Sequence, residues 1–280
     1  MENGGKSRVA DALGLRHPPV ALLWADEAPE GATRFKKGGW GCVMWLVAAA
    51  AKGRTAACDR ETFGCFGGGV GLGFGDQYRN FPGGMDCFCR FLSTGNEPSE
   101  EGRRVAEAVK PHMAPEAHEE FLHGERYLRS PELVARFAEN LPMADIPARF
   151  VVFRPLTGAP PRSGLPRVVI FLANPHQIAA LVVLVNYDGR HNEHVTVPFA
   201  AGCQSIGIYP YREAESEDPR AVLGLVDLSA RLQLRPKLGD DLFTFAVPWK
   251  LFERMEANVA GSFLERPTWR ALRGDPATPR

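Results

Sequence analysis

The longest apolar stretch of the chain, residues 168–185, is interrupted by the polar sequence Asn174-Pro175-His176-Gln177. A helix that spans a bilayer needs about 20 uninterrupted apolar residues, so the interruption argues against a membrane span. It predicts instead a buried strand over residues 168–172, followed by a helix that starts at Asn174-Pro175 and ends near residue 185. A strand followed directly by an apolar helix is typical of a mixed α/β fold.

The same order of strand and helix occurs earlier in the chain. Residues 18–24 place an apolar run after a proline pair and predict a buried strand, and residues 42–52 predict an Ala-rich buried helix that Gly53 closes. Further strands are predicted at 54–58, 149–154, 194–198, 203–209 and 242–247, and further helices start at Ser99, Pro115, Ser130 and Pro248. The sequence therefore predicts an α+β (mixed α/β) fold with helical insertions.

Two stretches of the chain share one plan. Each runs from a strand through a helix to a second strand and then to a Gly-Cys step, at Cys65 in the first stretch and at Cys203 in the second. We therefore expect two related halves, 8–155 and 165–265, that pack about a pseudo-twofold axis within a single module, 1–280. A coincidence of two ordinary α/β patterns is the alternative explanation. If the chain is duplicated, Cys65 and Cys203 occupy equivalent positions near the place where the halves meet.

The length of 280 residues suits one large domain or two small ones. A loop of Gly, Pro and Ser at 157–166 is the best candidate for a boundary between the halves. The tail at 273–280 is expected to be disordered.

The charges of the chain are balanced, with 33 Lys and Arg against 33 Asp and Glu. A nucleic-acid-binding protein usually carries a basic excess or a basic stripe, so we expect no nucleic-acid partner. The N-terminal sequence has no apolar segment after its charges, which argues against a signal peptide. We therefore expect a cytoplasmic protein, without a membrane partner, whose six cysteines are reduced thiols or ligands rather than disulfides.

The cysteines are the first candidates for chemistry. Thiolates are soft ligands that suit zinc, copper and iron–sulfur clusters, and a cluster usually takes four of them. The expected set is Cys42, Cys65 and Cys203 with Cys87 or Cys89. No pair has the Cys-x-x-Cys spacing of a zinc ribbon or ferredoxin, and buried structural thiols are the alternative. A nucleophilic Cys65 or Cys203 is a third interpretation, which would require a lowered thiol pKa.

A glycine-rich segment, residues 64–75, surrounds Cys65. Its register does not match Gly-x-Gly-x-x-Gly, and no Gly-Lys-Ser or Gly-Lys-Thr follows, so a Rossmann fingerprint and a P-loop are both excluded. Successive backbone N–H groups at Gly67, Gly68 and Gly69, with Gln204 from the second half, remain candidates for cofactor or anion binding. A tight loop packed against a helix is the alternative.

Two histidines and an aspartate complete the candidates. His191 and His194 are either metal ligands or, as their polar setting favours, part of a solvated turn. Asp227 lies in an apolar run four residues before Arg231, which predicts a structural ion pair between them. A place for Asp227 in the lining of a pocket is the alternative.

Several short motifs carry a resemblance to a known family. They are Leu13-Gly14-Leu15, Pro18-Pro19-Val20-Ala21, Gly41-Cys42-Val43-Met44, Glu61-Thr62-Phe63-Gly64-Cys65, Ala173-Asn174-Pro175, Ala201-Gly202-Cys203-Gln204-Ser205-Ile206 and Phe243-Thr244-Phe245-Ala246-Val247-Pro248. Together they resemble the prokaryotic family called domain of unknown function 169, over nearly the whole chain. The resemblance implies one module of this length, and it includes the positions of Cys42, Cys65 and Cys203. It implies no activity.

The sequence thus favours a protein that holds a cysteine-ligated metal or an iron–sulfur cluster, with iron–sulfur favoured over zinc, in a redox or regulatory role. A redox partner or a small-molecule ligand would follow from that role. The alternative is a small-molecule or anion-binding module with structural cysteines and no catalysis, and a non-enzymatic interaction protein is a third hypothesis. Whether the protein is an enzyme, and its oligomeric state, stay open at this point.

Overall fold

The computed structural model describes residues 7–156 and 164–274 of the 280-residue chain. The chain divides into two compact units: Met1–Phe74 with Ala144–Arg280, and Gly75–Met143. We call the first the sheet unit and the second the helical unit. The predicted boundary loop and the predicted disordered tail lie mostly outside the described residues.

The sheet unit is built around a seven-stranded sheet in the order β2-β3-β1-β4-β7-β6-β5. The strands are β1 (Val20–Ala25), β2 (Ala56–Asp59), β3 (Phe150–Pro155), β4 (Val168–Ala173), β5 (Val195–Thr196), β6 (Ala221–Gly224) and β7 (Phe243–Pro248). β5 and β6 are parallel, and the other neighbouring pairs are antiparallel. The prediction of a mixed α/β fold is confirmed.

The sheet order bears on the predicted duplication. β1 and β4 pair at its centre with Ala21 opposite Val169. From β1 outward the order is β3 and β2, and from β4 outward it is β7 and β6. The predicted second strand of the second half, β5, lies one place farther out, beside β6. Strand order alone does not separate a duplication from a coincidence, so the duplication stays a prediction.

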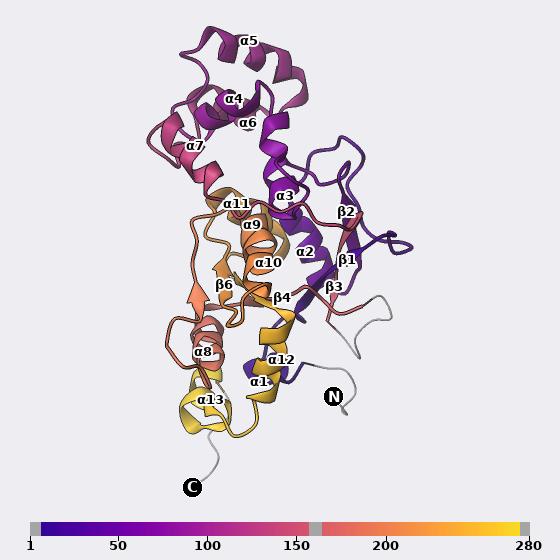
Figure 1. Cartoon of the computed structure of the whole chain (residues 1–280), viewed down its shortest axis with the longest axis vertical. Helices are drawn as coiled ribbons and strands as arrows, with labels where there is room; N and C mark the ends of the chain where they lie inside the picture. Colours follow the sequence, from indigo (N-terminus) through magenta and orange to yellow (C-terminus); the bar gives the residue numbers. More distant parts are fainter. Residues whose placement is uncertain (1–6, 157–163, 275–280) are drawn as a thin grey trace. The chain divides into compact units, whose positions relative to one another are not determined.

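Helices cover both faces of the sheet (Figure 1). On one face, an apolar core that includes Phe171 and Phe245 joins β4 and β7 to α1 (Arg8–Leu13), α8 (Pro175–Val185), α12 (Trp249–Ala257) and α13 (Pro267–Arg273). The other face carries α2 (Val43–Ala51) over β1–β3, and α9 (Gly202–Ile206) and α10 (Ile208–Ala214) over β6 and β7. On this side α3 (Phe66–Gly71) packs against α9, and α11 (Leu228–Leu238) packs against α2. A short 3-10 helix, η3 (Phe263–Glu265), precedes α13.

The start of α8 confirms its sequence prediction. The Asn174 side chain accepts the Gln177 N–H at 3.0 Å, and Gln177 Oε1 accepts the Asn174 N–H at 2.9 Å. This reciprocal capping box satisfies two N–H groups that a helix start otherwise leaves without partners. It explains why the apolar stretch breaks into a strand and a helix at this point.

The strand predicted at 203–209 is wrong, because these residues form most of α9 and the start of α10. Ile206, Ile208 and Tyr209 favour a strand by local propensity. However, the Ala201 N–H donates to Gln204 Oε1 at 2.9 Å and starts α9, and Gly207 separates the two helices. Packing against α3 and β6 therefore overrides the local preference. The strand predicted at 194–198 is shorter than expected, because β5 holds only Val195 and Thr196.

The helical unit contains η1 (Gln77–Asn80), α4 (Gly84–Phe91), α5 (Glu100–Val109), η2 (Lys110–His112), α6 (Pro115–His123) and α7 (Pro131–Glu139). Its core is aromatic, with the Phe81 ring 5.9 Å from that of Phe121 and the Tyr78 ring 3.9 Å from that of Phe88. Ser99 caps α5, as predicted, by accepting the Gly102 N–H at 3.2 Å.

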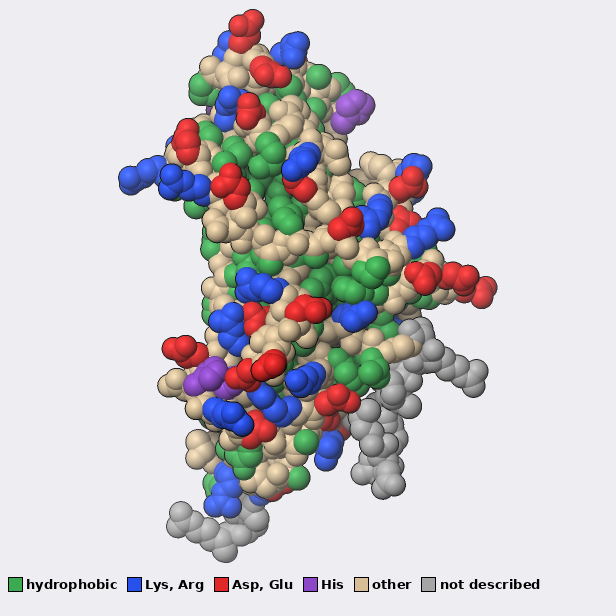
Figure 2. Space-filling view, in the orientation of Figure 1, with side chains coloured by type: hydrophobic (Ala, Val, Ile, Leu, Met, Phe, Trp, Pro, Cys, Tyr) green, Lys and Arg blue, Asp and Glu red, His purple; other side chains and the backbone are tan. Residues whose placement is uncertain are grey.

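The distribution of surface charges and the apolar character of the helices agree with the expectations from the sequence. On the face drawn in Figure 2, acidic and basic side chains are interspersed. Within residues 7–156 and 164–274, no helix combines the length and apolar character that crossing a bilayer requires.

Candidate functional site

Three of the predicted cysteine ligands lie at helix starts in the sheet unit. Cys42 is the N-cap residue of α2, and Cys65 is the N-cap residue of α3. Cys203 is the second residue of α9. Backbone N–H groups at a helix start favour negative charge, and for each thiol this effect opposes burial without cancelling it.

Two glycines allow these helix starts to approach one another. Gly64 has a φ of +83°, and a β carbon on it would collide with the Gly41 carbonyl, so the residues before Cys65 and Cys42 lie side by side. A β carbon on Gly71 would lie 2.7 Å from the Cys203 carbonyl carbon and 2.9 Å from Cys203 Sγ. The backbone of α3 therefore touches α9 directly. Within the glycine-rich segment, residues 66–71 form a helix that lies close to the cysteines.

Hydrogen bonds tie the sulfurs to α3. The Gly68 N–H donates to Cys65 Sγ at 3.3 Å, and the Cys203 thiol donates to the Gly67 carbonyl at 2.9 Å. The Gly69 N–H donates to the Cys65 carbonyl at 3.0 Å. The sequence suggested that the N–H groups of Gly68 and Gly69 bind an anion. In the structure the Gly68 N–H donates to the Cys65 sulfur and the Gly69 N–H donates to the Cys65 carbonyl. Gln204 is fully buried and caps α9 through its side chain.

Asp227 joins the start of α9 to the start of a further helix, α11. Its Oδ1 atom accepts the N–H groups of Ser229 and Ala230 at the start of α11, and its Oδ2 atom accepts the Gly202 N–H at 3.1 Å. The predicted ion pair with Arg231 is replaced by this capping role. The Arg231 guanidinium instead lies over the ring of Phe243, 4.4 Å from its centroid.

Burial dominates the electrostatics of the three thiols. Burial, followed by the charge of Cys65, raises the pKa of Cys42 to about 12. Burial also raises the pKa of Cys65, and it raises the pKa of Cys203 well above its ordinary value, with the charges of Cys65 and Cys42 adding to the shift. The Asp227 carboxylate acts in the same direction on all three. A nucleophilic cysteine would need the opposite shift, so this geometry disfavours the third interpretation.

The three sulfur atoms are near one another without forming a compact ligand set. In the described part of the chain, a set whose ligand atoms all lie within 4.8 Å of one another is found for His191, His194 and Asp218 and not for the cysteines. The fourth predicted ligand, Cys87, lies in the helical unit, where it is buried beside Ala106 and Phe121. All six cysteines are free thiols.

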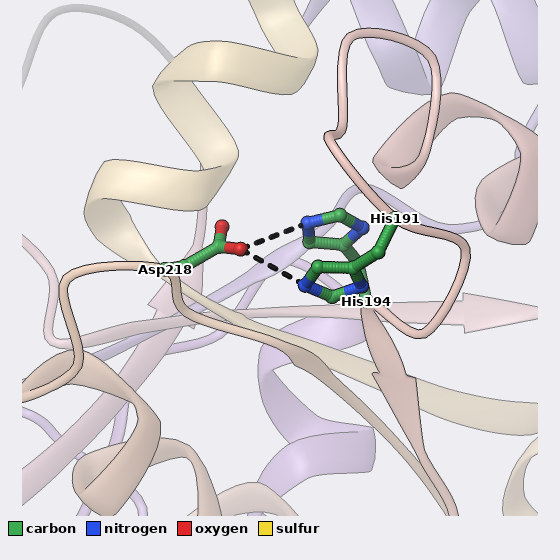
Figure 3. Close-up of side chains that lie close together, drawn as sticks. All are labelled: His191, His194 and Asp218. Atoms are coloured by element: carbon green, nitrogen blue, oxygen red, sulfur yellow. Dashed lines mark hydrogen bonds and ion pairs between the residues drawn. The ribbon is translucent and has the colours of Figure 1, made fainter.

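The histidine set was only partly anticipated. His194 is 1% exposed, so its interpretation as part of a solvated turn is wrong, whereas His191 is exposed as expected. Asp218 Oδ2 lies 3.1 Å from His191 Nε2 and 3.2 Å from His194 Nε2 (Figure 3). Asp218 was missed, because no local pattern links it to histidines more than 20 residues away. No signal in the sequence pointed to it, because the strand that follows Asp218, β6, was not predicted.

The comparison with family models identifies the chain. The model of DUF169, described as Uncharacterised ArCR, matches residues 8–258. The chain belongs to the DUF169 family. The match includes every cysteine of this DUF169 protein and the histidine set, and it confirms the resemblance seen in the sequence motifs. Neither a curated protein nor a solved structure matches the chain.

Proposed function

We propose that this DUF169 protein binds an iron–sulfur cluster through Cys42, Cys65 and Cys203 and serves a redox or regulatory role. One observation carries the proposal: three thiols from three helix starts gather around α3 in a single compact unit. Cys65 and Cys203 lie 23 and 161 positions after Cys42 in the chain (65 − 42 and 203 − 42), so proximity in the sequence does not explain why they approach it. The close helix contacts at Gly64 and Gly71 therefore support a shared role for the thiols.

The spacing of the sulfurs favours a cluster over a single ion. Tetrahedral zinc with Zn–S bonds of about 2.3 Å holds its thiolates roughly 3.8 Å apart. The three sulfurs do not all lie within 4.8 Å of one another, yet the charge of Cys65 raises the pKa of Cys42, and the charges of Cys65 and Cys42 raise the pKa of Cys203. The ligands of a 4Fe–4S cluster bind different irons and are therefore farther apart than those of one ion. This spacing supports the preference for iron–sulfur over zinc.

The raised pKa values mean that a cation would be needed to hold all three thiols as thiolates. Three buried thiols beside an aspartate stay protonated in the absence of a cation, because each added negative charge opposes the next. A metal cluster supplies positive charge that displaces the protons, so its binding would release protons and weaken at low pH. The Gly68 N–H that points at Cys65 Sγ would stabilise the bound thiolate.

The fourth position of the site is the main departure from the sequence prediction. We assign no ligand role to Cys87, which has its own apolar surroundings in the helical unit. Asp227 is the acidic residue whose charge acts on all three thiols, and its Oδ2 atom accepts one backbone hydrogen bond and keeps a second lone pair. We therefore propose Asp227 as the fourth ligand or as the neighbour of an open iron.

The test is the metal content of the full-length protein purified without oxygen. We expect a brown protein with visible absorption, and iron and acid-labile sulfide in similar amounts. Each of the three single substitutions Cys42→Ala, Cys65→Ala and Cys203→Ala should remove the iron. The matched controls are Cys58→Ala, which alters a buried thiol in β2 of the same unit, and Cys87→Ala; both should keep it.

Three results would contradict the proposal. The first is iron that is retained in all three ligand variants. The second is a colourless protein that holds zinc in a one-to-one ratio. The third is loss of iron in Cys58→Ala to the same degree as in Cys65→Ala, since this would indicate general unfolding rather than loss of a ligand. Circular dichroism of each variant separates unfolding from ligand loss.

A further inference from the structure

A parallel strand pair brings His194 and Asp218 together at one edge of the sheet. His194 directly precedes β5, and Asp218 precedes β6 by three residues. The Ala221 N–H donates to the His194 carbonyl at 2.8 Å and fixes the register of the two strands. Because parallel strands begin at the same edge, the side chains before them become neighbours.

His191 completes the group from the turn before β5. Its ring stacks on that of His194, with centroids 4.0 Å apart and an interplanar angle of 3°. As Figure 3 shows, the Nε2 atoms of both rings face the same carboxylate oxygen, Asp218 Oδ2. We propose that His191, His194 and Asp218 form a binding site for a divalent transition-metal ion, independent of the thiols.

The hydrogen bonds around His194 leave its Nε2 atom suited to a cation. The Asn186 amide donates to the Val182 carbonyl at 2.8 Å, which fixes its oxygen toward His194. His194 Nδ1 lies 2.9 Å from that oxygen, so Nδ1 is assigned the proton. In this tautomer His194 presents the lone pair of Nε2 to Asp218 Oδ2 at 3.2 Å. Two acceptors at this distance need a cation between them, either a proton or a metal ion.

The stacked rings bring two nitrogen ligands to one carboxylate. Because the rings are parallel and 4.0 Å apart, the exposed His191 ring would tilt so that the Nε2 atoms of both histidines reach one metal ion together with the carboxylate. Nδ1 of His191 accepts the Glu193 N–H at 3.1 Å. Ligation of a metal ion by His191 Nε2 would move the ring proton to Nδ1 and break this exposed hydrogen bond. Release of a proton from the pair of His194 and Asp218 would complete the exchange of a proton for the metal ion.

A second layer of charge orients the carboxylate. Arg254 of α12 lies 3.6 Å from Asp218 Oδ1 and 3.5 Å from Asp188 Oδ1. The guanidinium therefore engages the Oδ1 atom and leaves Oδ2 for the histidines. Asp188 offsets the charge of Arg254, so a divalent ion would meet a net negative site. Partners of this kind fix ligand orientation around metal ions in proteins.

The ligand types select the class of metal, and the ligand distances are compatible with it. Zinc bound to two nitrogens and one oxygen at about 2.0–2.2 Å would separate tetrahedral ligand atoms by roughly 3.3 Å. The two distances to Asp218 Oδ2 are 3.1 Å and 3.2 Å, which lie near this value. Two imidazoles and a carboxylate suit zinc, cobalt and ferrous iron, and three protein ligands leave a position open for water or substrate.

The experiment titrates the chelator-treated full-length protein with Co²⁺ alone and records its visible spectrum. Thiolate ligands give sulfur-to-cobalt charge-transfer absorption, and nitrogen and oxygen ligands do not, so the two sites are read separately. We expect one Co²⁺ per chain without charge-transfer absorption. Asp218→Asn should weaken this binding at least tenfold, and Glu217→Gln, which alters the adjacent exposed carboxylate, should leave it unchanged.

A second measurement tests the proposal on the wild-type protein, in case a variant does not fold. Imidazole nitrogen NMR of the wild-type protein should show a shift of His194 Nε2 on addition of Zn²⁺, with Nδ1 still protonated. The proposal is overturned if Asp218→Asn and Glu217→Gln bind Co²⁺ equally well, if all bound Co²⁺ shows thiolate absorption, or if the His194 signals do not move. Failure of the thiol site leaves each of these outcomes unchanged.

Discussion

Substitution of Gly71 by alanine tests whether the direct contact of α3 with α9 holds the thiol site. The new β carbon would lie 2.7 Å from two backbone atoms of α9, the carbonyl carbon of Cys203 and the nitrogen of Gln204. Ordinary contact begins at 3.4 Å, so the helices would have to separate by about 0.7 Å (3.4 − 2.7). Backbone atoms have no rotamer that relieves such an overlap.

Two opposing effects set the magnitude for Gly71→Ala. Alanine is favoured over glycine by about 1 kcal/mol in a helix interior, and because Gly71 is the last residue of α3 this gain is an upper limit. Overpacking of a well-packed contact costs about 1–3 kcal/mol, and a clash with backbone belongs in the upper half of this range. We expect the free energy of unfolding to fall by about 1–2 kcal/mol, with a lower urea midpoint and an unchanged slope. Cys203 would move with α9, so the iron content should fall as well.

The sign of the result decides the question for Gly71→Ala. A variant that is more stable than the wild type would show that helix propensity dominates and that α3 does not touch α9 as described. Normal stability together with normal iron content would refute the link between this contact and the cysteines. Urea unfolding followed by far-ultraviolet circular dichroism gives the stability, and iron analysis of the same sample gives the occupancy.

The remaining predictions concern two buried glutamates. Glu256 accepts the Ser7 hydroxyl and the Arg8 N–H, so Glu256→Ala should lower the free energy of unfolding by about 2–3 kcal/mol, whereas the exposed neighbour Glu253→Ala should change it by less than about 0.5 kcal/mol in the same urea assay. Burial alone would raise the pKa of Glu213, but hydrogen bonds from Arg220 hold it below its ordinary value of 4.5. This stabilisation is present above pH 4.5 and is lost as the pH falls through the lower folded pKa, so the acid-induced loss of stability should be smaller in Glu213→Gln. An equal acid-induced loss of stability in the wild type and in Glu213→Gln would contradict a stabilising ion pair between Glu213 and Arg220.

The helix starts show what local sequence can predict. Asn174 followed by Pro175 and Gln177 predicts the start of α8, and Ser99 predicts that of α5, because a cap forms between residues three apart. The strands β1, β4 and β7 follow in the same way from short apolar runs. The strand predicted at 203–209 fails, because the packing of α9 against α3 outweighs the preferences of Ile206 and Tyr209.

The two candidate sites differ in how much of each was predictable. The Gly-Cys steps at Cys65 and Cys203 single out these thiols in the sequence alone, and both cysteines lie at helix starts near Cys42. The sequence did not indicate that Cys87 lies in a separate unit or that Asp227 caps α11 beside Gly202. Such relations join residues that are distant in the chain, and no periodicity encodes them.

The sequence by itself determined the alternation of strands and helices, the balanced charge and the membership of one family-wide module, since these depend on composition and on neighbours a few positions apart. Only the tertiary structure decided which side chains meet. The parallel register of β5 and β6 sets His194 beside Asp218, and the space left by Gly71 sets Cys203 beside α3. The physical reason is that strand register and helix approach are fixed by burial over the whole sheet unit.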